Sequence, residues 1–290
     1  MNDIRRLAVI GAGTMGRGIA QTAAAAGIVV TLHDLSPDLL HSALDAIRAS
    51  LDEAVARRKS SPVFRDVVLD RIRPVADFSA ALDAVDLAIE SVPESLPLKL
   101  DIFRRLDAAA PPAAILATNT SALPVAELAA ATSRPDRVLG LHFFNPVPLM
   151  PLLEVVRTPS TSLATVDTAL ALAHRLAKQP IVVRDSPGFA TSRLGLAIGL
   201  EAMRMLEQGV ASAEDIDRAM TLGYRHPVGP LRLTDLVGLD VRLAVAEHLH
   251  RTLATDTFRP PEILRRLVAE GKLGKKVGQG FYRWDEPQTP

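Results

Sequence analysis

Two kinds of hydrophobic pattern alternate over the first 185 residues. Short apolar runs, which predict buried strands, occur at 5–10, 28–33, 88–92, 114–117, 138–141 and 181–183. Between them, apolar residues recur at helical spacing at about 37–59, 95–109, 124–131 and 162–178. Strands alternating with helices are typical of a doubly wound, mostly parallel sheet. We therefore predict an α/β domain over residues 1–185.

One connection between predicted strands in this domain is longer than a single helix requires. The segment from Pro37 to Arg73 is long and rich in charge, and Ser61-Pro62 interrupts it. Proline removes a backbone donor and fits the first turn of a helix better than its interior. We predict a helical hairpin, bent near Ser61-Pro62 and inserted into the sheet domain.

The pattern changes at residue 186. Ser186 and Pro187 suit the cap and first position of a helix, and apolar residues from Phe189 onward follow helical spacing until Gly209. Ser212 with Asp215 has the form of a capping box. Further helical patterns lie near 230–236, 239–254 and 261–270, with no strand pattern between them. We predict an all-helical domain over residues 186–290.

A glycine motif follows the first predicted strand. It reads Gly11-Ala12-Gly13-Thr14-Met15-Gly16 and precedes an Ala-rich helical stretch. In this context G-x-G-x-x-G is typical of Rossmann-like dinucleotide binding, because the loop lets backbone N–H groups and the helix N-terminus approach a pyrophosphate. Asp34 ends the second strand, where an acid accepts hydrogen bonds from the adenosine ribose and repels a 2′-phosphate. Leu35 and Ser36 bring no positive charge, so we predict NAD as the cofactor.

A histidine and a glutamate stand in two later apolar runs joined by a Pro-rich turn. His142 lies in Gly140-Leu141-His142-Phe143-Phe144-Asn145-Pro146, and Glu154 lies in Leu152-Leu153-Glu154-Val155-Val156. Strands joined in this way lie side by side, so the two groups can meet. A carboxylate beside an imidazole fixes its tautomer and stabilises the imidazolium. The alternative is a buried structural histidine and an ordinary strand glutamate.

Composition narrows the classes of function. The 290 residues contain 33 Lys plus Arg and 33 Asp plus Glu, so no net field attracts nucleic acid or a membrane surface. With no cysteine, the chain has no disulfide, thiolate chemistry or cysteine-ligated metal, which fits a reducing compartment. Arg17 interrupts the first apolar region, and no stretch reaches the length of a membrane span. We expect a cytoplasmic protein.

Taken together, these motifs resemble the 3-hydroxyacyl-CoA dehydrogenase family, in particular short 3-hydroxybutyryl-CoA dehydrogenases. The resemblance also rests on Thr118-Asn119-Thr120-Ser121, on Asp185-Ser186-Pro187-Gly188-Phe189 and on the glycine-rich segment from Gly274 to Tyr282. It implies NAD-dependent oxidation of an (S)-3-hydroxyacyl-CoA to the 3-oxoacyl-CoA. His142 is then the general base, and Glu154 orients it.

The resemblance assigns further residues by their matching positions. Ser121 matches a serine that bonds the substrate oxygen and touches the cofactor. Positions near the cofactor are matched by Glu94, Lys99, Asn145 and Lys276. Ser50 and Arg57 match positions that contact CoA. By the residues alone, these would pass for turn, cap and surface residues.

At one position the chain departs from the family pattern. Ser192 stands where the family usually has an asparagine near the thioester end of the substrate. Serine still donates a hydrogen bond but reaches less far. Because of this departure, one alternative is an NAD-binding protein with weakened catalysis. A second alternative is a dehydrogenase of free hydroxy or sugar acids, similar to gulonate dehydrogenase and lambda-crystallin. The resemblance also implies a homodimer formed through the helical domain.

Overall fold

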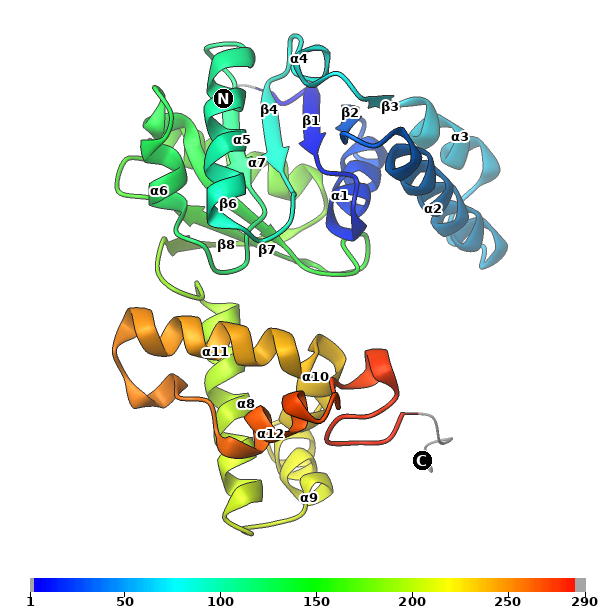
Figure 1. Cartoon of the computed structure of the whole chain (residues 1–290). Coiled ribbons are helices and arrows are strands. Elements are labelled where there is room, and N and C mark those ends of the chain that lie inside the picture. The colour runs from blue at the N-terminus through cyan, green and yellow to red at the C-terminus, as the bar shows by residue number, and fades with distance from the viewer. Residues whose placement is uncertain (1–2, 285–290) are drawn as a thin grey trace. The chain divides into compact units, whose positions relative to one another are not determined.

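The computed structural model describes residues 3–284 and divides the chain into two compact units, Met1–Ser186 and Pro187–Pro290 (Figure 1). The outermost ends of the two predicted domains, residues 1–2 and 285–290, lie outside the described residues. Within 3–284, no helix combines the length and the hydrophobicity that crossing a bilayer requires.

The first unit is built on a single eight-stranded sheet with the order β3-β2-β1-β4-β5-β6-β7-β8. All neighbouring strands are parallel except β6 and β7, which are antiparallel as their short connection predicts. The strands are β1 (Arg6–Ile10), β2 (Val29–His33), β3 (Ile72–Val75), β4 (Leu87–Glu90), β5 (Ile115–Thr118), β6 (Val138–Phe143), β7 (Leu152–Arg157) and β8 (Gln179–Arg184).

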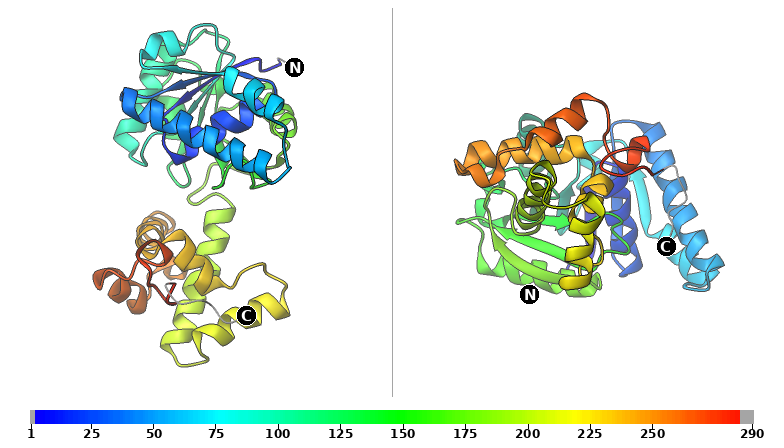
Figure 2. Two further views of the ribbon diagram at one scale, coloured as in Figure 1. Left: turned by 90° about the vertical axis from the view of Figure 1, so that its right-hand side faces the viewer. Right: turned by 90° about the horizontal axis from the view of Figure 1, so that it is seen from below.

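Helices cover both faces of this sheet (Figure 2). One face packs against α1 (Thr14–Ala25), α2 (Pro37–Ala56), α3 (Pro62–Asp70) and α7 (Leu163–Arg175). The remaining helices of the unit are α4 (Phe78–Ala81), α5 (Leu96–Ala109), α6 (Val125–Ala130) and the 3-10 turn η1 (Pro135–Arg137). This arrangement confirms the predicted doubly wound α/β class.

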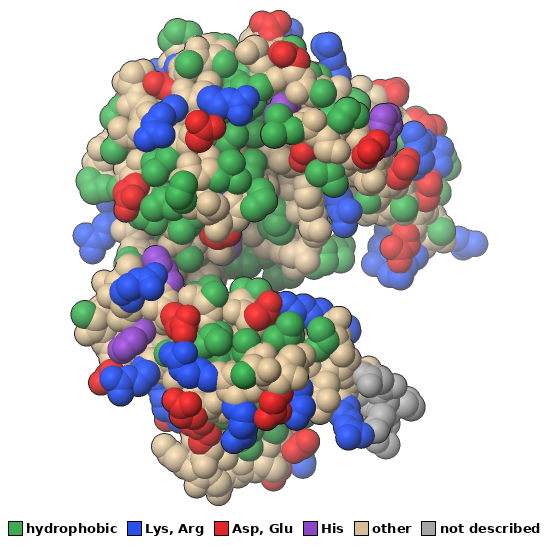
Figure 3. Space-filling model, viewed as in Figure 1, with side chains coloured by type: hydrophobic (Ala, Val, Ile, Leu, Met, Phe, Trp, Pro, Cys, Tyr) green, Lys and Arg blue, Asp and Glu red, His purple; other side chains and the backbone are tan. Residues whose placement is uncertain are grey.

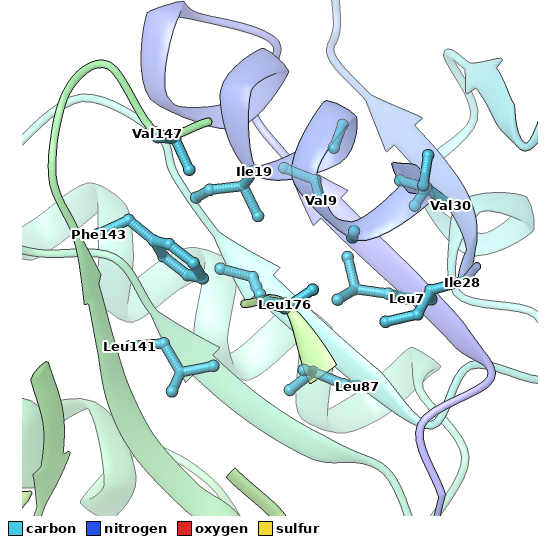
Figure 4. Packing of buried hydrophobic residues seen from close by; sticks show 14 of the residues in the cluster. Leu7, Val9, Ile19, Ile28, Val30, Leu87, Leu141, Phe143, Val147 and Leu176 are labelled. Carbon is cyan, nitrogen blue, oxygen red and sulfur yellow. The ribbon is translucent and has the colours of Figure 1, made fainter. Parts of the chain in front are cut away.

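Alternate residues of the central strands form the core beneath α1 and α7. Figure 4 shows Leu7, Val9 and Leu87 pointing into this layer with Ile19, while Phe143 and Val147 lie nearby. Because side chains alternate between the faces of a strand, the residues between these core positions point to the opposite face. That opposite face carries the polar groups described below.

The predicted hairpin is confirmed as α2 and α3, each capped by a serine. Ser36 Oγ accepts from Leu39 N and Ser61 Oγ from Phe64 N, and a proline follows each cap. The sequence analysis missed the next strand, β3, because its four residues include Arg73 and Pro74. As an edge strand, β3 tolerates a proline that a central strand would not.

The second unit is helical, as predicted for the C-terminal region. It consists of α8 (Thr191–Glu207), α9 (Ala213–Arg218), the π-helical turn η2 (Ala219–Gly223), α10 (Pro230–Val237), α11 (Leu239–Leu253), η3 (Asp256–Phe258), α12 (Glu262–Ala269) and η4 (Lys275–Val277). Ser212 caps α9 through the predicted contact with Asp215 N. The segment after α12 folds back so that Asp235 accepts from Phe281 N, Tyr282 N and Trp284 Nε1.

The predicted start of the first helix in this unit is wrong. α8 begins at Thr191 with Ala190 as its N-cap, and not at Pro187. Gly188 and Phe189 have φ values of 74° and 48°, which a right-handed helix excludes. Phe189 is buried all the same, so its apolar character reflects burial in a turn and not a position on the helix.

Candidate active site

Four polar side chains share the sheet face opposite the α1–α7 core. Glu90 of β4 pairs in register with Thr118 of β5, and His142 of β6 pairs with Glu154 of β7. All four are buried, and they lie near the carboxyl ends of β4, β5 and β6 and the start of β7. Ligands of open α/β sheets bind at the carboxyl ends of the strands. The sheet therefore places a polar cluster at the edge where a ligand is expected.

His142 and Glu154 form the shortest polar contact of this cluster. Their Nδ1 and Oε2 atoms are 2.6 Å apart, and the Glu154 side chain is fully buried. The Phe144 ring is tilted against the imidazole at a centroid distance of 4.4 Å. A carboxylate on Nδ1 holds the proton there and leaves Nε2 as the nitrogen that can take up a second proton. The predicted meeting of the two groups is confirmed.

A cavity of about 750 Å³ opens beside this pair, entirely within the first unit. The glycine loop forms one wall: Gly11 has a φ of 106°, and a Cβ at Gly16 would lie only 1.8 Å from the carbonyl oxygen of Gly11. A Cβ at Gly13, in contrast, would meet no atom within 4 Å. The loop thus packs tightly beneath and stays open above, as a pyrophosphate lying on the N-terminus of α1 requires.

Most of the predicted cofactor residues line this cavity. Its lining includes Gly11, Gly13, Thr14, Met15, Asp34, Glu94, Lys99, Ser121, His142 and Asn145. Of the remaining loop residues, Ala12 donates its N–H to Asp34 Oδ2 at 2.9 Å, which fixes the carboxylate, and Gly16 is buried in α1. The residues present fit NAD, with Asp34 at the ribose position and the loop at the pyrophosphate.

Arg105 of α5 also lines the cavity, and the sequence analysis missed it. Its guanidinium lies 4.1 Å from the centroid of the Phe78 ring, which in turn packs edge-on against His33. Burial lowers the pKa of His33, and the Arg105 charge acts in the same direction. The sequence analysis considered only the charge at Leu35 and Ser36, and the folded cavity adds the Arg105 guanidinium to its wall.

Lys99 is not on a solvated helix face but is buried, and it joins two carboxylates. Its Nζ lies 2.6 Å from Glu90 Oε1 and 3.4 Å from Glu94 Oε2. The fully buried Glu90 also accepts from Val92 N and from Thr118 Oγ1, both at 2.7 Å. A buried carboxylate is tolerated when its oxygens are paired and hydrogen-bonded in this way.

Glu94 connects this hydrogen-bond network to Ser121, the predicted substrate-binding serine. Its Oε1 accepts from Thr120 Oγ1 at 2.5 Å and from Ser121 N at 3.0 Å, and Ser121 Oγ lies 3.3 Å away. Glu94 therefore holds the turn after β5, and Lys99 compensates its charge from below. Sequence reasoning missed Glu90, although a charged residue inside the apolar run 88–92 is a signal that could have identified it.

Asn145 stands in a loop that neighbouring side chains fix. The Asn145–Pro146 peptide bond is cis. Just before the loop, Asn119 Oδ1 accepts from Phe143 N at 2.9 Å. After it, the buried Lys178 ammonium donates to the carbonyls of Val147 and Met150, and burial lowers its pKa. These contacts position Asn145 on the wall of the cavity.

Besides Ala12, Gly16 and Glu154, four predicted residues do not line the cavity. Ser50 Oγ accepts from Gln21 Nε2, and the exposed Arg57 pairs with Glu53 at the end of α2. Ser192 and Lys276 belong to the second unit, where Lys276 Nζ contacts both carboxylate oxygens of Asp240 at 2.6 Å. Burial alone would raise the pKa of Asp240, but the hydrogen bonds from Lys276 hold it below its usual value.

A second hollow of about 820 Å³ lies at the opposite edge of the sheet, lined by residues at the starts of β1, β4 and β5. It contains Arg5 and Arg137 together with Asp86, whose carboxylate accepts from the backbone of Arg5 and Arg6. Dinucleotides bind at carboxyl ends of strands, so the smaller cavity at Gly13 is the candidate site.

Comparison with known proteins agrees with this assignment. The sequence model of the family described as "3-hydroxyacyl-CoA dehydrogenase, NAD binding domain" matches residues 6–186, and that of "3-hydroxyacyl-CoA dehydrogenase, C-terminal domain" matches residues 188–284. A probable 3-hydroxybutyryl-CoA dehydrogenase of Bacillus subtilis is 42% identical over 98% of this chain and 99% of its own.

Two further relatives extend the likeness to vertebrates and to solved structures. The mitochondrial hydroxyacyl-coenzyme A dehydrogenase of Homo sapiens is 41% identical over 97% of this chain and 91% of its own. The crystal structure of (S)-3-hydroxybutyryl-CoA dehydrogenase from Ralstonia eutropha superposes with a TM-score of 0.95 at 40% identity, covering 98% of this chain and all of that one. The chain therefore belongs to the 3-hydroxyacyl-CoA dehydrogenase family, and its first unit is an NAD-binding domain.

Proposed function

We propose that the protein oxidises an (S)-3-hydroxyacyl-CoA with NAD, giving the 3-oxoacyl-CoA, NADH and a proton. The observation that carries the proposal is the buried His142–Glu154 pair at 2.6 Å, whose His142 lies on the wall of the cavity that fits the dinucleotide. The names of the similar proteins support the same reaction and favour short acyl chains.

His142 takes the proton from the 3-hydroxyl group through Nε2 in this reaction. Bound NAD supplies the acceptor for the hydride that leaves carbon 3. Glu154 keeps the first imidazole proton on Nδ1 and stabilises the imidazolium that forms. General-base assistance of this kind contributes roughly 10²- to 10⁴-fold in rate. In reverse, the imidazolium returns its proton to the alkoxide oxygen.

Ser121 donates a hydrogen bond to the reacting oxygen when substrate is bound, and Glu94 sets its position through the backbone N–H contact described above. Lys99 and Asn145 contribute to cofactor binding, as does Lys276 of the second unit. The helical unit contributes Ser192 to the substrate, and Ser50 and Arg57 of α2 contact CoA. These roles rest on the resemblance and extend the proposal beyond the His142–Glu154 pair.

The reduction of acetoacetyl-CoA by NADH tests this function, and the reaction is monitored through the decrease in NADH absorbance. We expect turnover with acetoacetyl-CoA and none with free 3-oxo acids or sugar acids. His142→Gln should lower kcat by at least about 10²-fold while leaving NADH affinity in place. Unchanged turnover in His142→Gln would contradict the mechanism, and turnover of free acids alone would favour the sugar-acid branch.

We also propose that two copies pair through the helical unit. Leu194 and Ile198 of α8 are 65% and 38% exposed and stand four residues apart on one helix face. Exposed apolar side chains of this kind mark interaction surfaces, and two-fold pairing of identical faces is the commonest closed assembly. Sedimentation should give a dimer mass, and Leu194→Glu should shift it toward the monomer. A monomeric wild-type protein would refute this.

The proposal includes a cytoplasmic location, because the reaction draws on dissolved NAD and CoA thioesters. Cell fractionation tests this: the protein should accompany cytoplasmic markers, and recovery with the membrane pellet would contradict it. The chain has equal numbers of basic and acidic residues, which are interspersed on the face shown in Figure 3, so no net charge attracts it to an anionic membrane surface.

A further inference from the structure

Arg105 is a half-buried arginine of α5 on the wall of the cavity in the first unit. Its Cζ atom lies over the Phe78 ring, 4.1 Å from the ring centroid. Within residues 3–284, the guanidinium forms no salt bridge or hydrogen bond in addition to this contact. One side of the planar group is therefore covered by an aromatic ring, while the side chain also borders the cavity. A guanidinium in this position can stack with a second flat ring.

The strand order places Arg105 at one end of the cavity. Phe78 begins α4 just after β3, and its ring packs edge-on against His33 at the end of β2. His142 belongs to β6, which is four strands from β2 and, at about 4.8 Å per strand, about 19 Å away across the sheet. Asp34, at the ribose position, directly follows β2. With the nicotinamide at His142, the adenosine end of the dinucleotide therefore lies beside Arg105.

Apolar side chains line the cavity near Arg105. Leu98, Ile102 and Arg105 are spaced by four and three residues, so they share one face of α5. Leu35, in the turn after β2, and Leu39 of α2 line the cavity as well, and they are 77% and 51% exposed. Large exposed leucines at the edge of a cavity mark a surface that binds an apolar group. The two faces of an adenine ring are such a surface.

We propose that Arg105 holds the adenine ring of NAD by stacking, with its guanidinium between that ring and the Phe78 ring. The inference adds a residue to the NAD site, and it rests on the proposed function only for the end at which the nicotinamide lies. A guanidinium stacks on aromatic faces more readily than an ammonium because it is planar and more weakly hydrated. Phe78 holds the guanidinium in place before the cofactor binds, so less side-chain entropy is lost on binding.

The test measures binding without turnover, using the fluorescence of NADH and of reduced nicotinamide mononucleotide, which lacks the adenosine. Arg105→Met should raise the Kd of NADH by about 5- to 30-fold, the range of a cation–π contact in a partly desolvated site. The Kd of the mononucleotide should not change. Arg105→Lys should weaken NADH binding nearly as much, because it keeps the charge but loses the plane. Arg104→Met, at an exposed position of the same helix, is the matched control and should bind NADH normally.

Competition experiments with the wild type do not depend on the folding of any variant. AMP should displace NADH, whereas ribose 5-phosphate at the same concentration should not, because only AMP carries the base. Equal displacement by the two compounds would assign binding to the phosphate and overturn the inference. Failure of the wild type to bind NADH would contradict the cofactor itself, and the inference with it.

The variants give three further results that would overturn the inference. Full NADH affinity in Arg105→Lys would show that charge alone is sufficient. Equal weakening of NADH and of the mononucleotide in Arg105→Met would indicate a general change of the cavity. Weaker binding of NADPH but not of NADH in Arg105→Met would assign the guanidinium to a 2′-phosphate. None of these measurements involves a thioester, so reduction of acetoacetyl-CoA tests the proposed function separately.

Discussion

Glu154→Gln isolates the charge of the active-site carboxylate from its shape. The side chain is fully buried, and its Oε2 lies 2.6 Å from His142 Nδ1. Glutamine fills the same volume, and its carbonyl oxygen still accepts from Nδ1–H, so the imidazole tautomer is kept. What the variant loses is the attraction between a carboxylate and the imidazolium that forms when the hydroxyl proton is transferred.

The size of the loss follows from the two kinds of hydrogen bond. A bond to a charged partner contributes about 1.5–3 kcal/mol and a neutral one about 0.5–1.5 kcal/mol. The difference, about 1–2 kcal/mol, is gained only as the proton moves, and it corresponds to a reduction in kcat of about 5- to 30-fold. NADH affinity should change by less than about twofold, because Glu154 does not line the cavity.

Stopped-flow measurements of NADH binding give the NADH affinity, and steady-state reduction of acetoacetyl-CoA gives kcat. Glu127→Gln, an exposed acid in the first turn of α6, is the control and should alter neither. If Glu154→Gln weakens NADH binding as much as it lowers kcat, the carboxylate supports the fold of the site and not the proton transfer. An unchanged kcat would refute the reasoning outright.

Three further predictions concern the cofactor and the buried charges. The kcat/KM for NADH should exceed that for NADPH by about 100-fold in steady-state assays, because a 2′-phosphate meets the Asp34 carboxylate; equal values would contradict this role. Lys99→Met leaves Glu90 buried without its cation and should lower the free energy of unfolding in denaturant by about 3–5 kcal/mol, whereas the double variant with Glu90→Gln should lose clearly less. Burial alone would raise the pKa of Asp107, but hydrogen bonds from Ser133 and Arg134 hold it below its usual value, so its stabilisation is present at neutral pH and lost as pH falls through the folded-state pKa. Asp107→Asn should cost about 1.5–3 kcal/mol at pH 7, and the difference from wild type should shrink below about pH 4 in unfolding experiments.

The parts of the site that the sequence predicts are those set by local rules. The glycine loop is recognisable because it joins a strand and a helix that are adjacent in sequence. Gly11 has a positive φ there, and Gly16 has no room for a Cβ. His142 and Glu154 are recognisable because a short turn forces their strands together. In both cases, residues close in sequence determine the geometry.

What the sequence does not reveal depends on contacts between distant segments. Arg105 reaches the cavity wall only because α5 packs beside β4, and nothing near position 105 indicates a nucleotide. The sequence does not show whether Lys99 lies on the buried or the exposed face of its helix, and only the fold shows that it contacts Glu90. The start of α8 was misplaced because Ser186-Pro187 looks like a cap, while the backbone at Gly188 and Phe189 prolongs the turn.

A charged residue at a position that the hydrophobic pattern assigns to the core is a feature that can be identified from the sequence alone, although its role cannot. Glu90 interrupts an apolar strand, and Arg242 occupies a core position of α11; both are nearly or fully buried. The fold compensates Glu90 through Lys99 and Thr118, which makes it part of the scaffold beneath Ser121. Arg242 has no such compensation within the described residues. The same sequence signal therefore separates into a compensated and an uncompensated buried charge only when partners are counted, because the side chains around each residue come from segments that the local pattern does not bring together.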